Sequence, residues 1–199
     1  AEHYHGLNLY LLCDPANEKA KGSDYTVMMV LGVGADKNHY IVTMVRDRLN
    51  LVERTRLLFR LHREYRPYEV RYEQYGMQAD IQHIEAKMDE ENYRFTIRPV
   101  GGKVSKIDRI MRLIPPFEAG TIYLPQRCPV TTQENVIEDM TRVFINQEYK
   151  AFPYMEHDDM LDCMARLFEP ELYIAYPEHS KGNIYGSTKQ QLLDDMDAS

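Results

Sequence analysis

The sequence contains few cysteines and no long apolar run, and each of these absences excludes a class of protein. Its three cysteines, Cys13, Cys128 and Cys163, are far apart and odd in number, which argues against a disulfide framework or a zinc site. We therefore expect a reduced, cytoplasmic setting. The longest apolar run, Val27 to Val33, is far shorter than the ~20 residues of a membrane-spanning helix, so we expect no membrane partner. The N-terminus lacks the basic and apolar regions of a signal peptide.

A basic excess is also absent, because the formal net charge is −7, and this argues weakly against a nucleic-acid partner. The charges are unevenly distributed, however. Eight arginines and four acids lie between Arg46 and Arg71, whereas acids dominate from Tyr154 onwards. A protein that gathers carboxylates around metal ions and places its basic residues elsewhere can have such a pattern. The chain begins with Ala1 rather than Met, so we expect a fragment of a longer protein.

With 199 residues, of which 44% are hydrophobic, the chain is long enough for one globular domain. Apolar periodicity and turn residues predict strands at 7–13, 25–33, 39–46, 69–72, 95–100 and 121–124. They predict helices at 51–65, 77–90, 104–114, 131–149 and 157–168. Asn50 is expected to cap the first helix, Pro115-Pro116 to end the third, and Thr131 with Glu134 to form a capping box. We expect Asp158 or Asp159 to cap the last helix.

Three strands with short links indicate an antiparallel meander, and a helix before the fourth strand requires a parallel crossover. The sequence therefore predicts an α/β fold with a mixed sheet, three antiparallel strands then parallel strands, flanked by helices. We expect one domain over residues 1–175 and a polar C-terminal tail over 176–199.

Acidic residues lie where predicted strands end and where the last helix begins. Asp14 and Glu73 follow two strands, and Asp158, Asp159 and Asp162 start the helix. Strand ends meet at one edge of a sheet, and clustered carboxylates repel each other unless a cation lies between them. Oxygen ligands favour Mg²⁺ or Mn²⁺, and two such ions ~4 Å apart suit phosphodiester hydrolysis. Each acid alone also has an ordinary interpretation as a turn, solvated or capping residue.

A basic segment follows the Gly101-Gly102 break, which can let a phosphate approach closely. Lys103, Lys106 and Arg109 are expected to contact the phosphate backbone of a nucleic acid, although a solvated helix face is the alternative. Nothing in the sequence supports a serine or cysteine nucleophile, and Cys13 is expected to be a small buried side chain.

Three motifs, in order over Leu9 to Leu167, resemble the nuclease domain of tailed-bacteriophage large terminases. They are DPA at 14–16 with KGSDYTV at 21–27, KVSKIDRI at 103–110 with PFEAG at 116–120 and IYLP at 122–125, and HDDMLDCMA at 157–165. The resemblance implies an RNase H-like fold and cleavage of double-stranded DNA by Mg²⁺ or Mn²⁺, as two ions, during viral genome packaging.

The resemblance also implies roles for single residues. Asp14 matches the catalytic aspartate of the first strand, and Glu73 matches the acid of the fourth strand. The closing acid, a catalytic and metal-binding residue, is Asp158, Asp159 or Asp162, with Asp159 and Asp162 expected to be catalytic. Asp24 matches an auxiliary acid, at a longer spacing from Asp14 than the family has.

The partners that the resemblance implies are double-stranded DNA, the ATPase domain of the same full-length protein, the portal protein and the small terminase subunit. The implied location is the host cytoplasm, at the portal of the viral procapsid. A motor would need a G-x-x-x-x-G-K-[ST] loop, but Gly102-Lys103 is followed by Val104 and preceded by Ile97 at the first glycine position, so the ATPase is absent from this chain.

Two alternatives stay open. The first is another RNase H-like phosphodiesterase, such as a junction resolvase or RNase H itself. The second is a non-catalytic module that binds DNA or the portal. Acids at all three expected positions argue against a decayed site.

Overall fold

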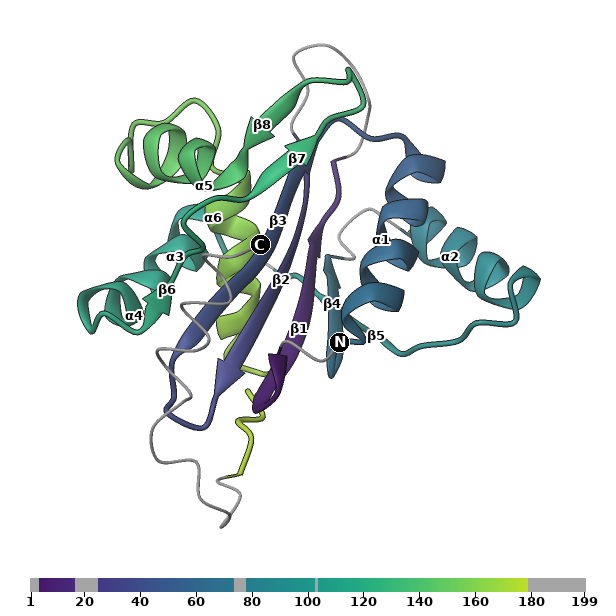
Figure 1. The fold of residues 1–199 in the computed structure, drawn as a ribbon, viewed down its shortest axis with the longest axis horizontal. Helices are drawn as coiled ribbons and strands as arrows, with labels where there is room; N and C mark the ends of the chain where they lie inside the picture. Colours follow the sequence, from purple (N-terminus) through teal and green to yellow (C-terminus); the bar gives the residue numbers. More distant parts are fainter. Residues whose placement is uncertain (1–3, 17–24, 74–77, 103, 179–199) are drawn as a thin grey trace.

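The structure is a computed structural model that describes residues 4–16, 25–73, 78–102 and 104–178. Within these residues six strands form one mixed sheet in the order β5-β4-β1-β2-β3-β6 (Figure 1). The strands are β1 (Leu7–Asp14), β2 (Thr26–Gly34), β3 (His39–Asp47), β4 (Glu69–Glu73), β5 (Ile97–Val100) and β6 (Ile122–Tyr123). The first three are antiparallel neighbours, and β4, β5 and β6 each pair in parallel. The predicted α/β mixed sheet is therefore confirmed.

The carboxyl ends of β1 and β4 lie side by side at one edge of the sheet. The parallel register between these strands ends with Cys13 opposite Tyr72, one residue before Asp14 and Glu73. Side chains alternate between the two faces of a strand. Leu11 and Cys13 pack in one hydrophobic cluster, and Tyr10 and Leu12 pack in the other. Asp14 consequently belongs to the same face as Leu12.

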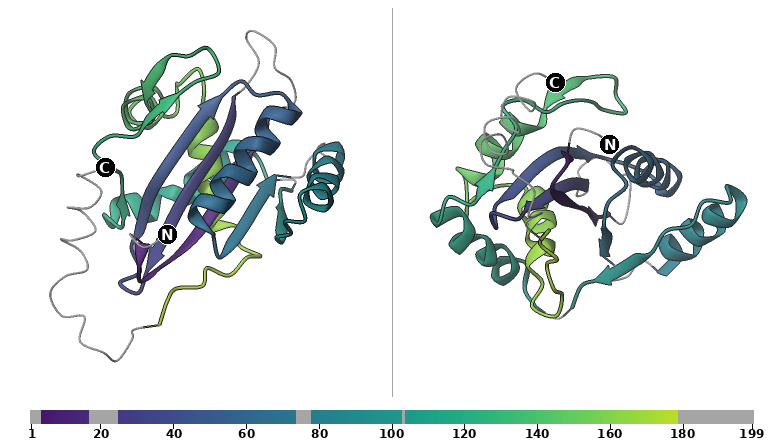
Figure 2. Two further views of the ribbon diagram at one scale, coloured as in Figure 1. Left: turned by 45° about the vertical axis from the view of Figure 1, so that its right-hand side comes forward. Right: turned by 60° about the horizontal axis from the view of Figure 1, so that its bottom comes forward.

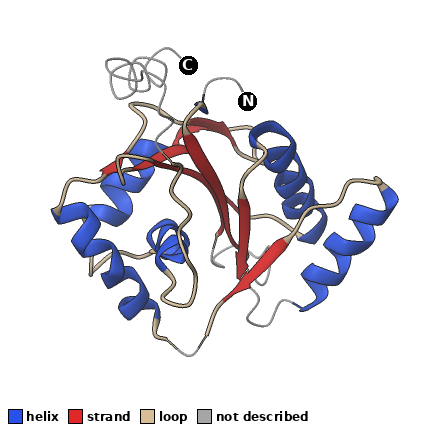
Figure 3. Ribbon diagram, turned by 90° about the horizontal axis from the view of Figure 1, so that it is seen from below, coloured by secondary structure: helices blue, strands red, loops and turns tan. Residues whose placement is uncertain are grey.

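Helices cover both faces of the sheet (Figures 2 and 3). One face packs against α1 (Leu51–Tyr65) and α2 (Gln78–Glu90), with Leu58, Phe59 and Leu61 in its cluster. The other face packs against α6 (Asp159–Ala165) and its 3₁₀ extension Arg166–Phe168. Helix α6 is surrounded by three shorter helices, α3 (Lys106–Ile110), α4 (Ile114–Glu118) and α5 (Met140–Val143). Every residue of α6 is buried, so this helix is the centre of its layer.

Helix α1 has the predicted bounds because its start and end signals are local. Asn50 and Glu53 form a reciprocal capping box, in which Glu53 N donates to Asn50 Oδ1 at 2.9 Å and Asn50 N donates to Glu53 Oε2 at 2.8 Å. Arg66 ends the helix with a φ of +46°, immediately before Pro67.

The predicted helix over 131–149 is wrong in its first half, whereas residues 140–149 are helical. Strands β7 (Pro129–Thr131) and β8 (Ile137–Asp139) form a hairpin there, followed by α5 and a π-helix over Phe144–Tyr149. The β-branched side chains around the turn favour strands, and Asn135 takes the left-handed conformation that the turn needs, with a φ of +58°. Asp139, rather than Thr131, caps the helix by accepting from Thr141 N.

The expected helix over 104–114 is also divided differently. Ser105 caps α3, a 3₁₀ turn covers Met111–Leu113, and α4 begins at Ile114. Pro115 and Pro116 do not end a helix, because they occupy the first turn of α4, where a missing N–H costs no hydrogen bond.

The predicted C-terminal tail is described only up to residue 178. Ala175 N donates to the hydroxyl of Tyr10 at 2.7 Å, and Asn8 Nδ2 donates to Ala175 O at 2.7 Å. Residues 179–199 lie outside the described residues. In the described part of the chain, no helix combines the length and the apolar character needed to cross a bilayer.

We predict that the buried ion pair between α1 and α2 contributes strongly to stability. Arg54 donates to both oxygens of Asp80, at 2.6 Å each, and the hydroxyl of Tyr72 donates to the same carboxylate. Arg54→Met leaves a buried charge without its cation and should lower the free energy of unfolding in urea by about 3–5 kcal/mol. Arg63→Gln, which removes the exposed pair between Arg63 and Glu91 of the same two helices, is the control and should cost much less. Equal losses would contradict this interpretation.

Candidate metal centre

Three carboxylates meet at the edge of the sheet where β1 and β4 end. Asp14, Glu73 and Asp162 each offer one oxygen, and these oxygens all lie within 4.8 Å of one another. Asp14 and Glu73 come from the strands, and Asp162 comes from α6, which packs on the same face as Asp14. Asp14 and Glu73 are half-buried, whereas Asp162 is buried.

The electrostatics of this acid triad favour a cation. Burial, followed by the charges of Glu73 and Asp162, raises the pKa of Asp14 well above its usual value. A cation between the three groups would offset both effects. The donors are carboxylate oxygens alone, which are the ligands of hard ions such as Mg²⁺ and Mn²⁺, so the residues present fit such an ion.

Two arginines partly neutralise the acid triad. Arg109 forms a bidentate pair with Asp162, with Nε–Oδ1 at 2.8 Å and Nη2–Oδ2 at 2.6 Å. Arg166, which is fully buried, contacts the carboxylate of Glu73 through Nη2 and donates from Nη1 to Glu169 Oε1 at 2.9 Å. Sequence reasoning missed Arg166, although its position four residues after Asp162 could have placed both on one helix face.

The other two acids at the start of α6 lie outside the acid triad. Lys106 Nζ lies 2.5 Å from Asp158 Oδ1 and 3.0 Å from Asp159 Oδ1. Burial lowers the pKa of Lys106, but its hydrogen bond to Asp158 and the charge of Asp159 outweigh this and raise the pKa above its usual value. Asp159 Oδ2 also accepts from Tyr25 N at 3.4 Å.

The cap of α6 comes from another part of the chain. Asp158 occupies the N-cap position, as one of the two predicted alternatives has it, but its side chain makes no capping bond, and Asp159 lies inside the helix. Glu148 of the π-helix caps it instead, because Oε2 accepts from Met160 N at 2.9 Å and from Leu161 N at 3.0 Å. This distant cap leaves Asp158 available to Lys106.

Two of the three residues predicted to contact DNA form ion pairs with acids of the chain itself. Lys106 holds Asp158 and Asp159, and Arg109 holds Asp162. The remaining two predicted residues, Lys103 and the auxiliary acid Asp24, lie outside the described residues.

Comparisons with known proteins agree with the sequence resemblance. The family described as the terminase RNaseH-like domain matches residues 11–169. A comparison with curated protein sequences gives no match.

Solved structures of terminase nucleases have a similar fold. A Mn-soaked, inhibitor-bound terminase nuclease domain of human cytomegalovirus has a TM-score of 0.57 at 14% identity, with 86% of this chain and 88% of that chain covered. The large terminase nuclease of thermophilic phage G20c has a TM-score of 0.53 at 17% identity, with 81% of each chain covered. The same nuclease with bound magnesium has a TM-score of 0.50 at 18% identity, with 81% of this chain and 80% of that chain covered. The predicted RNase H-like fold is therefore confirmed.

We predict that Glu148 makes stability depend on pH. Burial raises its pKa to about 7, although the amide of Leu161 and the charge of Arg46 lower it. The folded protein then binds more protons than the unfolded chain between the unfolded pKa of about 4.3 and the folded value, so stability falls as pH rises through this interval. Glu148→Gln keeps an acceptor oxygen and should remove most of this fall, which amounts to about 4 kcal/mol at most.

Urea unfolding at pH values below and above this interval measures the effect. Glu138→Gln, at an exposed glutamate of β8, is the control and should leave the pH dependence unchanged. An unchanged pH dependence in Glu148→Gln would show that this carboxylate is not the titrating group.

Proposed function

Because the chain belongs to the terminase RNaseH-like domain family, we propose that it is a metal-dependent endonuclease that cuts double-stranded DNA concatemers during viral genome packaging. The observation that supports this most directly is the acid triad of Asp14, Glu73 and Asp162 at the ends of two central strands and on α6. An arrangement of oxygen ligands around divalent ions suits phosphodiester hydrolysis.

In this proposal the acid triad holds Mg²⁺ or Mn²⁺. The metal would supply Lewis-acid activation of the phosphodiester and of the attacking water. We propose Asp159 and Asp158, which lie about one helical turn before Asp162, as ligands of the second of two ions. Lys106, which pairs with both acids, is then the counter-ion that this ion has to replace.

The same exchange supports a role in DNA binding. Once metal ions neutralise the carboxylates, Lys106 and Arg109 become free to contact phosphate oxygens of the backbone. We propose Lys103 as a third backbone contact and Asp24 as an auxiliary acid, both from the family motif. Arg166 is fully buried, so its part is to orient Glu73 through their ion pair.

The wider setting follows from the family. We propose the ATPase domain of the same full-length protein, the portal protein and the small terminase subunit as partners. The proposed location is the host cytoplasm, at the portal of the procapsid. The division into a domain over 1–175 and a tail over 176–199 stays a prediction.

An assay with three substrates in Mn²⁺ tests the function. A linear duplex, a four-way junction and an RNA–DNA hybrid distinguish a packaging nuclease from a resolvase or an RNase H. We expect cleavage of the duplex with little dependence on its sequence. Exclusive cleavage of the junction or the hybrid would contradict the proposal, and cleavage of none of them would favour a binding module.

We predict that Asp14→Asn abolishes cleavage and leaves the fold intact. The loss of a ligand charge should cost several kcal/mol of transition-state stabilisation, which is roughly a thousandfold in rate. The melting temperature without metal should stay level or rise, because burial and like charges already disfavour the ionised form of Asp14. Addition of Mn²⁺ should raise the melting temperature of the wild type but not of this variant.

Asp89→Asn, at an exposed acid of α2, provides the matched control and should keep both activity and the metal response. Wild-type cleavage by Asp14→Asn would refute its role. A large fall in its metal-free melting temperature would instead indicate a structural role.

We predict a graded effect for the acids of α6. Asp162→Asn should remove Mn²⁺ binding and cleavage together, because this oxygen belongs to the acid triad. Asp158→Asn and Asp159→Asn should keep the binding of the first ion at the acid triad, measured by thermal shift in Mn²⁺. They should weaken only the binding of the second ion. If all three variants retain full activity, the metal-site interpretation of this segment is wrong.

A further inference from the structure

The arginine-rich segment of the sequence divides into two groups in the structure. Most of the eight arginines between 46 and 71 have a defined partner in the fold. These are Arg46 with Gln147, Arg48 stacked on Tyr25, Arg54 with Asp80, Arg63 with Glu91, and Arg71 with Glu69. Among the described residues, Arg56, Arg60 and Arg66 are exposed and form no ion pair with a carboxylate.

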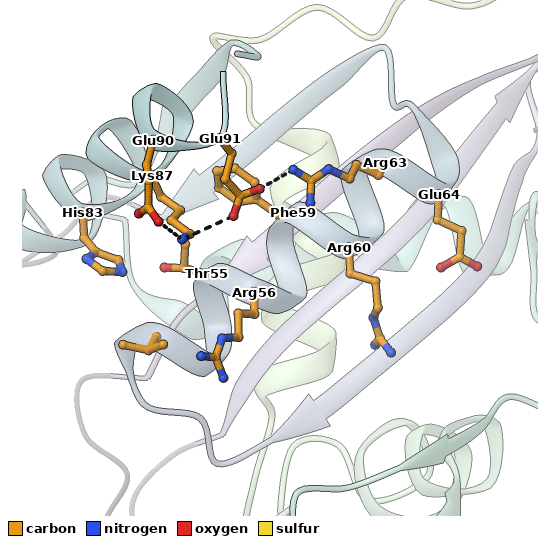
Figure 4. Close-up of a pocket in the computed structure, with 11 residues that line it drawn as sticks. Thr55, Arg56, Phe59, Arg60, Arg63, Glu64, His83, Lys87, Glu90 and Glu91 are labelled. Carbon is orange, nitrogen blue, oxygen red and sulfur yellow. Dashed lines mark hydrogen bonds and ion pairs between the residues drawn. The ribbon is translucent and has the colours of Figure 1, made fainter. Parts of the chain in front are cut away.

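Arg56 and Arg60 lie on successive turns of α1, about 6 Å apart along the helix axis. They line a groove between α1 and α2 with a cavity volume of about 570 Å³. Figure 4 shows both side chains extending to the same side of α1, away from the ion pairs in the groove.

The carboxylates of the groove do not neutralise this arginine pair. Lys87 binds Glu90 at 2.9 Å and Glu91 at 3.4 Å, and Arg63 also binds Glu91. Glu64 lies at the end of the groove opposite His83 (Figure 4). Glu64 also lies one helical turn after Arg60 but forms no ion pair with it, so a chain with a net charge of −7 presents here, among the described residues, two neighbouring arginines without an ion-pair partner.

The position of α1 relates this arginine pair to the acid triad. Helix α1 follows the carboxyl end of β3, where Asp47 pairs with Thr26, and the next residue of β2, Val27, pairs with Asp14. The start of α1 and Asp14 are therefore at the same end of the sheet (Figure 1). Lys106 and Arg109, in contrast, lie on α3 beside α6, on the other face.

We infer that Arg56 and Arg60 form a second contact surface for the phosphate backbone of duplex DNA, separate from Lys106 and Arg109. This inference rests on the proposed function of the acid triad. A duplex carries one negative charge per ~1.7 Å of its axis. DNA that extends beyond the cleavage site therefore still offers phosphates to cations that lie away from the acid triad. The contact adds affinity and orientation without sequence preference.

Equilibrium binding of the full chain to a fluorescently labelled linear duplex tests the inference. EDTA excludes cleavage, and fluorescence anisotropy is followed over a range of salt concentrations. Arg56→Gln/Arg60→Gln should lower the log–log salt slope by up to ~1.8, since each lost phosphate contact removes ~0.9. Affinity should fall roughly tenfold or more at about 0.1 M salt.

Arg94→Gln/Arg98→Gln is the matched control. It changes the net charge by the same amount, but each of its arginines already pairs with a carboxylate, Arg94 with Asp89 and Arg98 with Glu69. The control should keep the wild-type slope. A wild-type slope in Arg56→Gln/Arg60→Gln, or an equal loss in both pairs, would overturn the inference.

Cleavage kinetics in Mn²⁺ separate this surface from the acid triad. Arg56→Gln/Arg60→Gln should raise KM and keep kcat, because neither arginine is placed at the reacting atoms. A fall in kcat with an unchanged KM would contradict a binding role. If the wild type does not cleave, the proposed function fails, whereas the binding slopes still decide whether the arginine pair contacts DNA.

Discussion

Repulsion among three carboxylates at one sheet edge is the constraint on which the rest of this structure depends. Asp14 and Glu73 are brought together because β1 and β4 are parallel neighbours that end at the same level. Asp162 joins them because α6 packs on the face to which Asp14 belongs. Burial and the charges of Glu73 and Asp162 raise the pKa of Asp14, and a divalent ion between the three carboxylates would offset this repulsion.

Cations of the chain itself limit this repulsion. Arg109 donates to both oxygens of Asp162, and the buried Arg166 forms an ion pair with Glu73. Lys106 forms ion pairs with both Asp158 and Asp159. Under the proposed function, a metal ion would compete with these cations for the same carboxylate oxygens. Metal binding and DNA binding would then be linked, because a cation released from a carboxylate is free to contact a phosphate.

The sequence predicted those features that depend on neighbouring residues. The apolar runs of β1 and β2, the capping box of Asn50 and Glu53, and the acids after two strands were all visible in it. The spacing of Thr131 and Glu134 also matched a capping box, yet no helix begins there. The β-branched residues around Asn135 form the β7–β8 hairpin instead, and the helix begins later, after the cap at Asp139.

The closing acid could not be chosen from sequence, because Asp158, Asp159 and Asp162 occupy one and a half turns of the same helix. The first turn of that helix is capped by Glu148, which lies on a π-helix and accepts from the amides of Met160 and Leu161. Arg166 was missed for a similar reason, since its partners Glu73 and Glu169 are identified only once the strands and α6 are packed.

The most direct test of this account is the position of Mn²⁺ in a crystal of the wild-type chain soaked with that ion. The account predicts anomalous density bound by oxygens of Asp14, Glu73 and Asp162, at about 2.0–2.2 Å as hard divalent ions require. Density held only by Asp158 and Asp159, or an acid triad that stays metal-free at saturating Mn²⁺, would contradict it.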